Sequence, residues 1–231
     1  MIEKIITLKK PETLTVDDKT YIQDGYNPLL DRFPGSLDIN NLTGIVDYIN
    51  ASPEKWDGEL FIHVADFDHV FLYQGMIGDF NQRVTILSAD SRPCKFMFGR
   101  KIRVEDFIIA LHGMFLPNED RDYLLTLVSS VKIDASATLT DDGASQTVTA
   151  KQGVSSLVTP TVIKNPLLLQ PFRTFNEVEQ PASQFIFRFG KDGDSPVCSL
   201  HECDGEAWKQ EAIQRIKAFF IEELPDVPVI A

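Results

Sequence analysis

The chain has few cysteines, and their number argues against a disulfide-stabilised protein. Its 231 residues include three, Cys94, Cys198 and Cys203. An odd number in a chain of this length, with no secretory signal, is typical of reduced thiols. The first ten residues, MIEKIITLKK, carry Glu3 among apolar positions and have no small-residue cleavage site, so they predict a strand at Ile2–Leu8 and not a signal peptide. We therefore expect the protein to stay in the cytosol.

Positive charge is also scarce, which argues against nucleic acid as a partner. Lys and Arg total 22 against 34 Asp and Glu, and the formal net charge of -12 repels a phosphate backbone. The best local group of cations alternates with two phenylalanines: Arg92, Lys95, Phe96, Phe98, Arg100, Lys101 and Arg103. We interpret this stretch as a strand with a solvated polar face, and a local nucleic-acid site is the alternative.

Long apolar runs and known catalytic motifs are absent. No window approaches eighteen uninterrupted apolar residues, so the sequence predicts no transmembrane helix and no membrane partner. The chain carries no phosphate-binding loop, no GxSxG, no HExxH and no GxGxxG sequence. We therefore expect no catalytic residues and no cofactor. This pattern favours a protein that is not an enzyme, without deciding the question.

The strongest positive signal is a set of strand-like segments between residues 131 and 203. Residues 131–139 alternate between apolar and polar side chains, which is the pattern of a half-buried strand. A later segment places three aromatic rings on one face: Phe185, Phe187 and Phe189. The dipeptides Asp142-Gly143 and Asp192-Gly193 are typical of tight hairpin turns. Together they predict an antiparallel meander.

The first half of the chain predicts a second meander, with helices on either side. Residues 59–73, 82–88 and 95–101 have strand composition. Helical spacing of apolar residues recurs in four places, the last opened by Asp204 as a cap: residues 42–49, 104–115, 117–128 and 205–224. The sequence thus predicts an α+β fold, with antiparallel β-meanders and three or four helices packed on the sheets. We expect one compact domain over residues 1–231, with two packed halves, 1–130 and 131–231, as the alternative.

The order of segments near the C-terminus resembles a known family. A strand, an acidic turn and a strand are followed by LLLQPFRTFNEVEQPASQFIFRFG, a short strand and the helix EAWKQEAIQRIKAFFIEEL. This succession is similar to that of the YfdQ-like family of uncharacterised phage and prophage proteins, most closely over residues 131–224. The resemblance implies a viral or prophage-derived protein acting in the bacterial host cytoplasm. It implies no catalytic residue.

Two groups of side chains suggest metal ligands, but their spacing argues against both. On an unbroken strand, His63 and His69 would lie on the face opposite Asp66 and Asp68, although a turn between the aspartates would bring the four closer. In the second group, Cys198 lies opposite two other soft ligands and a fourth ligand is missing: His201 and Cys203. We therefore predict no metal site.

Residues 170–181, QPFRTFNEVEQP, form the candidate interaction surface. This segment sets aromatic and charged side chains between two prolines: Phe172, Arg173, Phe175, Glu177 and Glu179. Exposed aromatic residues and arginine are the usual anchors of interfaces. The interpretation we favour is that both rings pack inward and Arg173 pairs with a glutamate, and a surface for a partner or ligand is the alternative.

These observations favour a phage or prophage accessory protein that acts by binding or self-assembly and is not an enzyme. A protein that binds or processes a small ligand or nucleotide is the alternative, and a virion structural component is a weaker one. We also expect a homo-oligomer, because the C-terminal helix has a broad apolar face. Its members are Trp208, Ile213, Ile216, Phe219, Phe220 and Ile221. A protein partner would be compatible with the same face.

Overall fold

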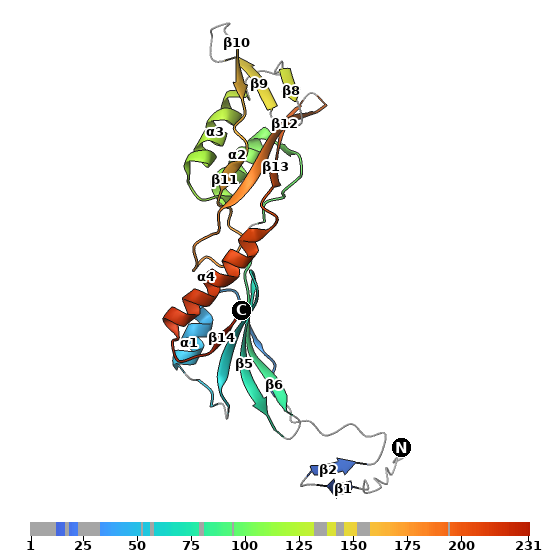
Figure 1. Ribbon diagram of the computed structural model, residues 1–231, viewed down its shortest axis with the longest axis vertical. Coiled ribbons are helices and arrows are strands. Elements are labelled where there is room, and N and C mark those ends of the chain that lie inside the picture. Colours follow the sequence, from blue (N-terminus) through green and yellow to red (C-terminus); the bar gives the residue numbers. More distant parts are fainter. Residues whose placement is uncertain are drawn as a thin grey trace, which may run out of the picture.

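The computed structural model confirms the α+β class. It describes residues 13–16, 19–22, 33–51, 53–55, 58–78, 81–93, 95–131, 138–141, 146–151, 158–193 and 195–231. These residues form four helices: α1 (Thr43–Ala51), α2 (Val104–Met114), α3 (Glu119–Val131) and α4 (Ala207–Glu223). Each helix falls where the apolar spacing predicts one. The molecule is elongated, with two larger sheets at different heights along its long axis (Figure 1).

The first sheet is antiparallel and has the order β11-β12-β13-β7. Its strands are β11 (Leu167–Leu169), β12 (Ser183–Asp192), β13 (Ser195–Glu202) and β7 (Ile102–Arg103). Alternate residues of β12 are buried, including the three phenylalanines, and Gly193 in the turn to β13 has a φ of 59°. The aromatic rings and the apolar faces of α2 and α3 form one hydrophobic core, called the first core here, which includes Phe96, Phe107, Leu124, Phe187 and Leu200.

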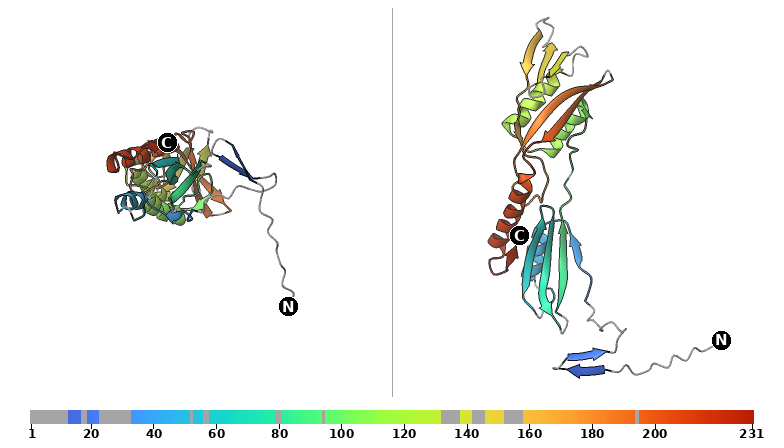
Figure 2. Two further views of the ribbon diagram at one scale, coloured as in Figure 1. Left: turned by 90° about the horizontal axis from the view of Figure 1, so that it is seen from below. Right: turned by 45° about the vertical axis from the view of Figure 1, so that its right-hand side comes forward.

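The second sheet is mixed and has the order β14-β4-β5-β6-β3. Its strands are β14 (Val229–Ile230), β4 (Leu60–Asp66), β5 (His69–Ile77), β6 (Gln82–Asp90) and β3 (Leu37–Ile39). The central hairpins are antiparallel, but β14 pairs with β4 and β3 pairs with β6 in parallel. Residues of α1 and α4 join this sheet in a second core, which includes Ile45, Leu72, Leu87, Ile216 and Phe220. Figures 1 and 2 show α4 (red) running from the level of the first sheet down beside the second.

Two smaller antiparallel sheets complete the described secondary structure. One pairs β1 (Thr13–Val16) with β2 (Lys19–Ile22). The other has the order β10-β9-β8, from β10 (Val158–Val162), β9 (Gln146–Lys151) and β8 (Thr138–Asp141). The predicted strand at Ile2–Leu8 and the predicted turn at Asp142-Gly143 lie outside the described residues, as does Cys94.

Three local expectations are wrong. Val131 ends α3 instead of starting a strand; β8 covers Thr138–Asp141, and residues 132–137 of the predicted strand lie outside the described ones. Residues 95–101 belong to no strand: residues 98–100 form a turn, with Gly99 at a φ of 73°, and β7 follows them. Asp204 does not cap α4 directly, because Glu206 is the N-cap residue, and the Asp204 carboxylate accepts a hydrogen bond from the Glu206 amide at 3.2 Å.

The two cores do not divide the chain at residue 130. The first core draws on residues 96–128 and again on 163–200. The second draws on residues 42–89, then on Phe175 and Val178, and finally on α4. The chain therefore crosses between the two cores several times. Over the described parts of the chain, every helix is too short or too polar to cross a membrane.

Candidate ligand site between the two cores

Residues 170–181, called the linker here, join the two cores. At one end Pro171 forms an isolated bridge with Phe115 of the first core, and the Phe172 amide donates to the Met114 carbonyl at 2.9 Å. Further along, Phe175 and Val178 insert into the second core. Phe175 is 1% exposed. The linker is therefore part of the packed interior, and its two ends belong to different cores.

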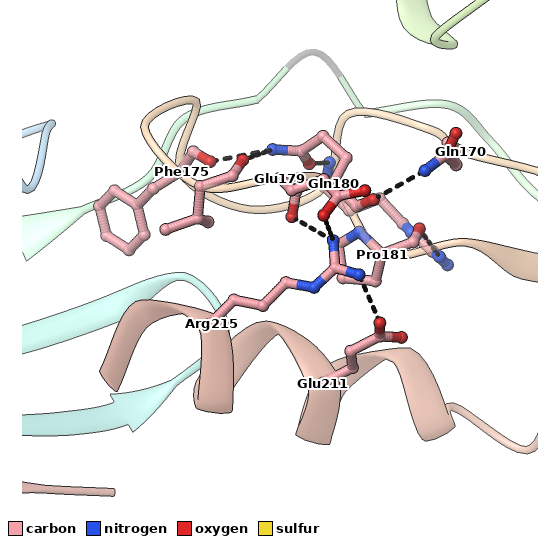
Figure 3. Close-up of polar contacts among 9 residues, drawn as sticks. Gln170, Phe175, Glu179, Gln180, Pro181, Glu211 and Arg215 are labelled. Carbon is pink, nitrogen blue, oxygen red and sulfur yellow. Dashed lines mark hydrogen bonds and ion pairs between the residues drawn. The ribbon is translucent and has the colours of Figure 1, made fainter. Parts of the chain in front are cut away.

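The side chain of Gln180 fixes the path of the linker. Its Oε1 atom accepts from the amides of Arg173 at 2.9 Å and Thr174 at 3.2 Å. Its Nε2 atom donates to the carbonyls of Phe175 at 2.9 Å and Val178 at 3.3 Å. One buried amide thus satisfies four backbone groups that belong to no strand ladder. Figure 3 shows Gln180 folded back over the linker.

The linker also binds α4. Arg215 donates from Nη1 to the Glu179 carbonyl at 2.8 Å, and its Nη1 lies 3.4 Å from the Glu179 carboxylate. Its other terminal nitrogen, Nη2, pairs with Glu211 one turn earlier on the helix (Figure 3). These contacts are at the surface and contribute little individually. They nevertheless hold the linker against the helix that fills the second core.

Arg173 is the buried charge of the linker. Its side chain is 7% exposed, and Nη1 donates to the Glu202 carboxylate at 2.7 Å. Nη2 donates to Ser183 Oγ and to the Pro181 carbonyl. Burial lowers the pKa of Arg173 to about 10, although Glu202 and Asp204 oppose that shift. The group stays charged at neutral pH, and its charge is matched by Glu202.

Aromatic rings surround this ion pair. The Arg173 guanidinium lies 3.8 Å from the ring centroid of Trp208 and 5.7 Å from that of Phe185. Trp208, at the start of α4, meets Phe67 of the β4–β5 turn edge to face at 4.8 Å. On the other side, Phe98 stacks on Phe185 at 5.1 Å. A continuous series of rings therefore runs from the second sheet, past the arginine, into the first core.

A cavity of about 190 Å³ opens beside these rings. We call it the junction cavity, and it is lined by Phe67, Pro93, Lys95, Phe96, Phe98, Pro171, Phe172, Arg173, Glu202 and Trp208. Two buried N–H donors of its lining residues, Arg173 Nε and Trp208 Nε1, have no acceptor among the described residues. The lining is mainly aromatic and includes the Arg173–Glu202 ion pair, and such a combination of apolar and a few polar groups is typical of a small-molecule site.

A second, more polar hollow of about 330 Å³ lies at the end of β3 and the start of α1. We call it the polar hollow, and it is lined by Asn40, Asn41, Thr43, Ser91, Arg92, Pro93, Thr174, Asn176 and Glu177. Glu177 Oε1 accepts from the amides of Leu42 at 2.7 Å and Thr43 at 3.4 Å. Asn41 Oδ1 accepts from Gly44 at 2.9 Å. The amides at the start of α1 are therefore already used by side chains.

The five residues of the candidate interaction surface have different surroundings. Phe172 is half-buried and lines the junction cavity with Arg173, whereas Phe175 is core. Glu177 binds the start of α1 and lines the polar hollow, and Glu179 is exposed beside Arg215. Arg173 pairs with a glutamate, as expected, but with Glu202 and not with one of its sequence neighbours.

The site also includes residues that the sequence does not connect with the linker: Phe67, Lys95, Glu202 and Trp208. They lie far from the linker in the chain and meet it through the fold. Two sequence signals were available: the cation group that contains Lys95, and the sequence of α4, where Trp208 begins a broad apolar face. That face is used within the chain, because five of its six apolar side chains pack in the second core or at the junction cavity. Ile221 is the exception, at 52% exposed.

The metal-ligand candidates do not converge. His63 lies among aromatic rings, 6.5 Å from Phe71 and 6.2 Å from Tyr73. His69 pairs through Nδ1 with Asp68 at 2.6 Å and through Nε2 with Asp90 at 3.3 Å. Within the described ranges, no three His, Cys, Asp or Glu side chains are grouped closely enough to hold a metal ion.

The second metal candidate is likewise dispersed. Cys198 is buried in the first core, where desolvation raises the pKa of its thiol to about 12. Cys203 is exposed beyond the end of β13, and burial raises the pKa of its thiol, to which the negative charge of Asp204 adds. His201 lies 3.1 Å from the Ser199 hydroxyl. Neither cysteine has the depressed pKa of a reactive thiolate.

Comparison with known proteins adds no assignment. No protein-family model, no curated protein and no solved structure matches this chain.

Proposed function

We propose that this protein is a binding protein, not an enzyme, and that it holds a small planar ligand in the junction cavity. The observation that carries the proposal is the pair of buried donors, Arg173 Nε and Trp208 Nε1, that find no acceptor in the described part of the chain. A buried donor without an acceptor costs about 1–3 kcal/mol. Both atoms lack accessible surface, so a ligand acceptor reaches them only after the lining side chains shift, and that contact would then recover the cost.

The aromatic lining supports a planar ligand. Phe67, Phe96, Phe98, Phe172 and Trp208 border the same cavity. Ring faces favour flat, polarisable groups, and each offset or edge contact contributes about 0.5–1.5 kcal/mol beyond the area buried. The carboxylate at the cavity belongs to Glu202, which is held by Arg173. Because Glu202 is engaged in this pair, it is not free to act as a general base. The cavity is therefore better suited to binding than to catalysis.

Trp208 provides the experiment. The chain has two tryptophans, so a Trp56→Phe variant leaves Trp208 as the sole indole fluorophore. Titrating this variant with small planar acids, nucleosides and nucleotides should quench or shift its emission in a saturable way. Phe172→Leu is the cavity variant, because it removes a lining ring without adding a second indole. Phe71→Leu, on β5 away from the cavity, is its matched control.

The expected result is saturable quenching that Phe172→Leu weakens and Phe71→Leu retains. Both rings are half-buried, so general destabilisation should be similar in the two variants. Equal loss of binding in both variants, or no saturable change with any of the compounds, would contradict a ligand site in the junction cavity.

We also propose a phage accessory role in the bacterial host cytoplasm. The support is the resemblance of residues 131–224 to prophage proteins. Immunodetection in fractionated lysogenic cells should place the protein in the cytosolic fraction. Its presence in purified virions at a fixed copy number would instead favour a virion structural component.

Self-assembly into a homo-oligomer is a second part of the proposal. Its support is the exposure of two isoleucines on different helices, Ile109 at 69% and Ile221 at 52%. Isolated exposed apolar residues are common, so the contact they support is a small one. Light scattering at micromolar concentrations should report more than one subunit, and Ile221→Ser should reduce the mass. A monomer throughout would contradict this part without affecting the ligand site.

A further inference from the structure

The junction cavity and the polar hollow are neighbours. Pro93 lines both of them. The wall between them includes a direct contact, because the Thr174 hydroxyl donates to the Phe67 carbonyl, and Thr174 borders the hollow while Phe67 borders the cavity. The two spaces therefore lie next to each other, separated by Pro93 and by the Thr174–Phe67 contact.

Two cations flank this proline. Arg92 lines the polar hollow and Lys95 lines the junction cavity, and both are exposed. Neither forms an ion pair with a residue that the structure describes, whereas Arg103, further along the same connection, pairs with Asp106 at 3.0 Å. The net charge of -12 repels a long polyanion, but Arg92 and Lys95 add local positive charge on the two sides of Pro93.

The carboxylates beside these cations are already engaged. Glu202 in the junction cavity pairs with Arg173, and Glu177 in the polar hollow accepts from two amides of α1. Their charges are thus partly offset, and an incoming anion meets Arg92 and Lys95 first. The other polar groups of the hollow are amides and hydroxyls, from Asn40, Asn41, Thr43, Ser91, Thr174 and Asn176. Amides and hydroxyls are suitable hydrogen-bond partners for sugar hydroxyls.

We propose that the ligand is a nucleotide, an inference that rests on the junction cavity being a ligand site. The base stacks among the aromatic rings of the junction cavity. The sugar lies across Pro93 against the polar hollow. The phosphate is held by Arg92 and Lys95. A nucleotide carries all three chemistries side by side: a flat acceptor-bearing ring, hydroxyls and an anion.

Calorimetric titration with the four ribonucleoside 5′-monophosphates, their nucleosides and inorganic phosphate tests this assignment. A nucleotide should bind at least about tenfold more tightly than its nucleoside, because a charge-assisted hydrogen bond contributes about that factor. The variant Arg92→Gln with Lys95→Gln should lower nucleotide affinity by at least about tenfold and nucleoside affinity by much less. The matched control is Arg100→Gln with Lys101→Gln, which removes two exposed cations of the same connection that line neither space.

The outcomes separate this inference from the proposed function. The nucleotide assignment would be overturned by equal affinity for nucleotide and nucleoside, or by equal loss of affinity in the test and control variants. In that case saturable quenching of Trp208 by planar acids would still support the junction cavity as a ligand site. Nucleotide binding that Phe172→Leu leaves unchanged would place the nucleotide elsewhere and also overturn it. If no compound binds at all, both proposals fail together.

Discussion

The two cores are assembled in different ways. The first core consists mainly of α2, α3 and an antiparallel meander whose consecutive strands pair with one another. The second core starts from consecutive hairpins but is completed by distant segments: Phe175 and Val178 from the linker, and Ile216 and Phe220 from α4. The segments that complete the second core therefore come after parts of the chain that belong to the first core. Changes in the linker should affect it most.

In each core one carboxylate joins a helix to a distant segment. The carboxylate belongs to the helix in the first core and to the distant segment in the second. In the first, Asp120 lies in the opening turn of α3 and accepts from the Leu168 amide of β11 at 2.7 Å. In the second, Glu177 of the linker accepts from the amides at the start of α1. Thus α3 provides the carboxylate that binds another segment, whereas the start of α1 is bound by a carboxylate from the linker. The receiving helix has no acidic residue in its own first turn.

The largest expected effect is on the second core. Phe175→Ala should lower the free energy of unfolding by about 3–5 kcal/mol, because it leaves a cavity among fully buried side chains. Phe172→Ala, three residues earlier and half-buried, should cost about 1–2 kcal/mol. Urea unfolding of both variants measures the difference. Equal losses would mean that the linker does not contribute to the second core in the way described.

Arg173→Ala should cost about 3 kcal/mol. The change removes a buried ion pair and leaves Glu202 without its partner, and the side chain of Glu202 is 28% exposed, which keeps the cost at the lower end of the range for such pairs. Arg215→Ala, at the more exposed contact between the linker and α4, should cost less than about 1 kcal/mol. A thermal melt of Arg173→Ala that matches the unaltered protein, with binding lost, would instead make Arg173 a recognition residue.

Glu177→Ala should cost about 1–2 kcal/mol, since it removes the acceptor for the amides that open α1. Glu179→Ala, two residues later and exposed, should change stability by less than about 0.5 kcal/mol. Chemical denaturation distinguishes the two. Hydrogen exchange should also show faster exchange of the α1 amides in the first variant, and slower or unchanged exchange there would contradict the capping role.

Asp120 should give the first core a pH dependence. Burial opposes ionisation of this carboxyl, but the Lys164 ammonium and the Leu168 amide outweigh it and hold the pKa below the ordinary value of 3.8. Because folding lowers this pKa, the contribution to stability is complete above 3.8 and is lost as the pH falls through the lowered value. The difference in stability between the unaltered protein and Asp120→Asn should therefore shrink below about pH 4. A difference that stays constant down to pH 2 would contradict the assignment.

The sequence predicted the helices well and some of the extended segments poorly, for a common reason. In α1 and α2 the apolar residues recur with the helical period, and one pattern fits. At Val131 two patterns overlap. Val131 follows Val128 at helical spacing, and it is also the first residue of the alternating stretch 131–139. Residues 95–101 alternate because Phe96 and Phe98 face the first core while Met97 is 56% exposed. Alternation reports which side is buried, but not whether a neighbouring strand is present.

Only part of the candidate site could be predicted from the sequence. Phe172 and Arg173 attract attention because a proline-bounded aromatic segment with arginine is unusual in plain core. The true partner of Arg173 could not be inferred, because Glu202 is on β13 while Glu177 and Glu179 are nearer in sequence and equally charged. Trp208 of α4 contacts the arginine, and Phe67 of the β4–β5 turn contacts Trp208. Such contacts depend on how the two cores are joined, and no local pattern encodes that.

The most direct test of the account is hydrogen–deuterium exchange with and without an excess of adenosine 5′-monophosphate and the three other ribonucleoside monophosphates. A ligand held at the junction should slow exchange in four separate segments that border it: residues 66–68, 91–98, 170–174 and 200–208. These segments come from both cores, so protection of all four by one nucleotide is the predicted result. Protection confined to a single core, or none with any of the nucleotides, would contradict a nucleotide site between the two cores.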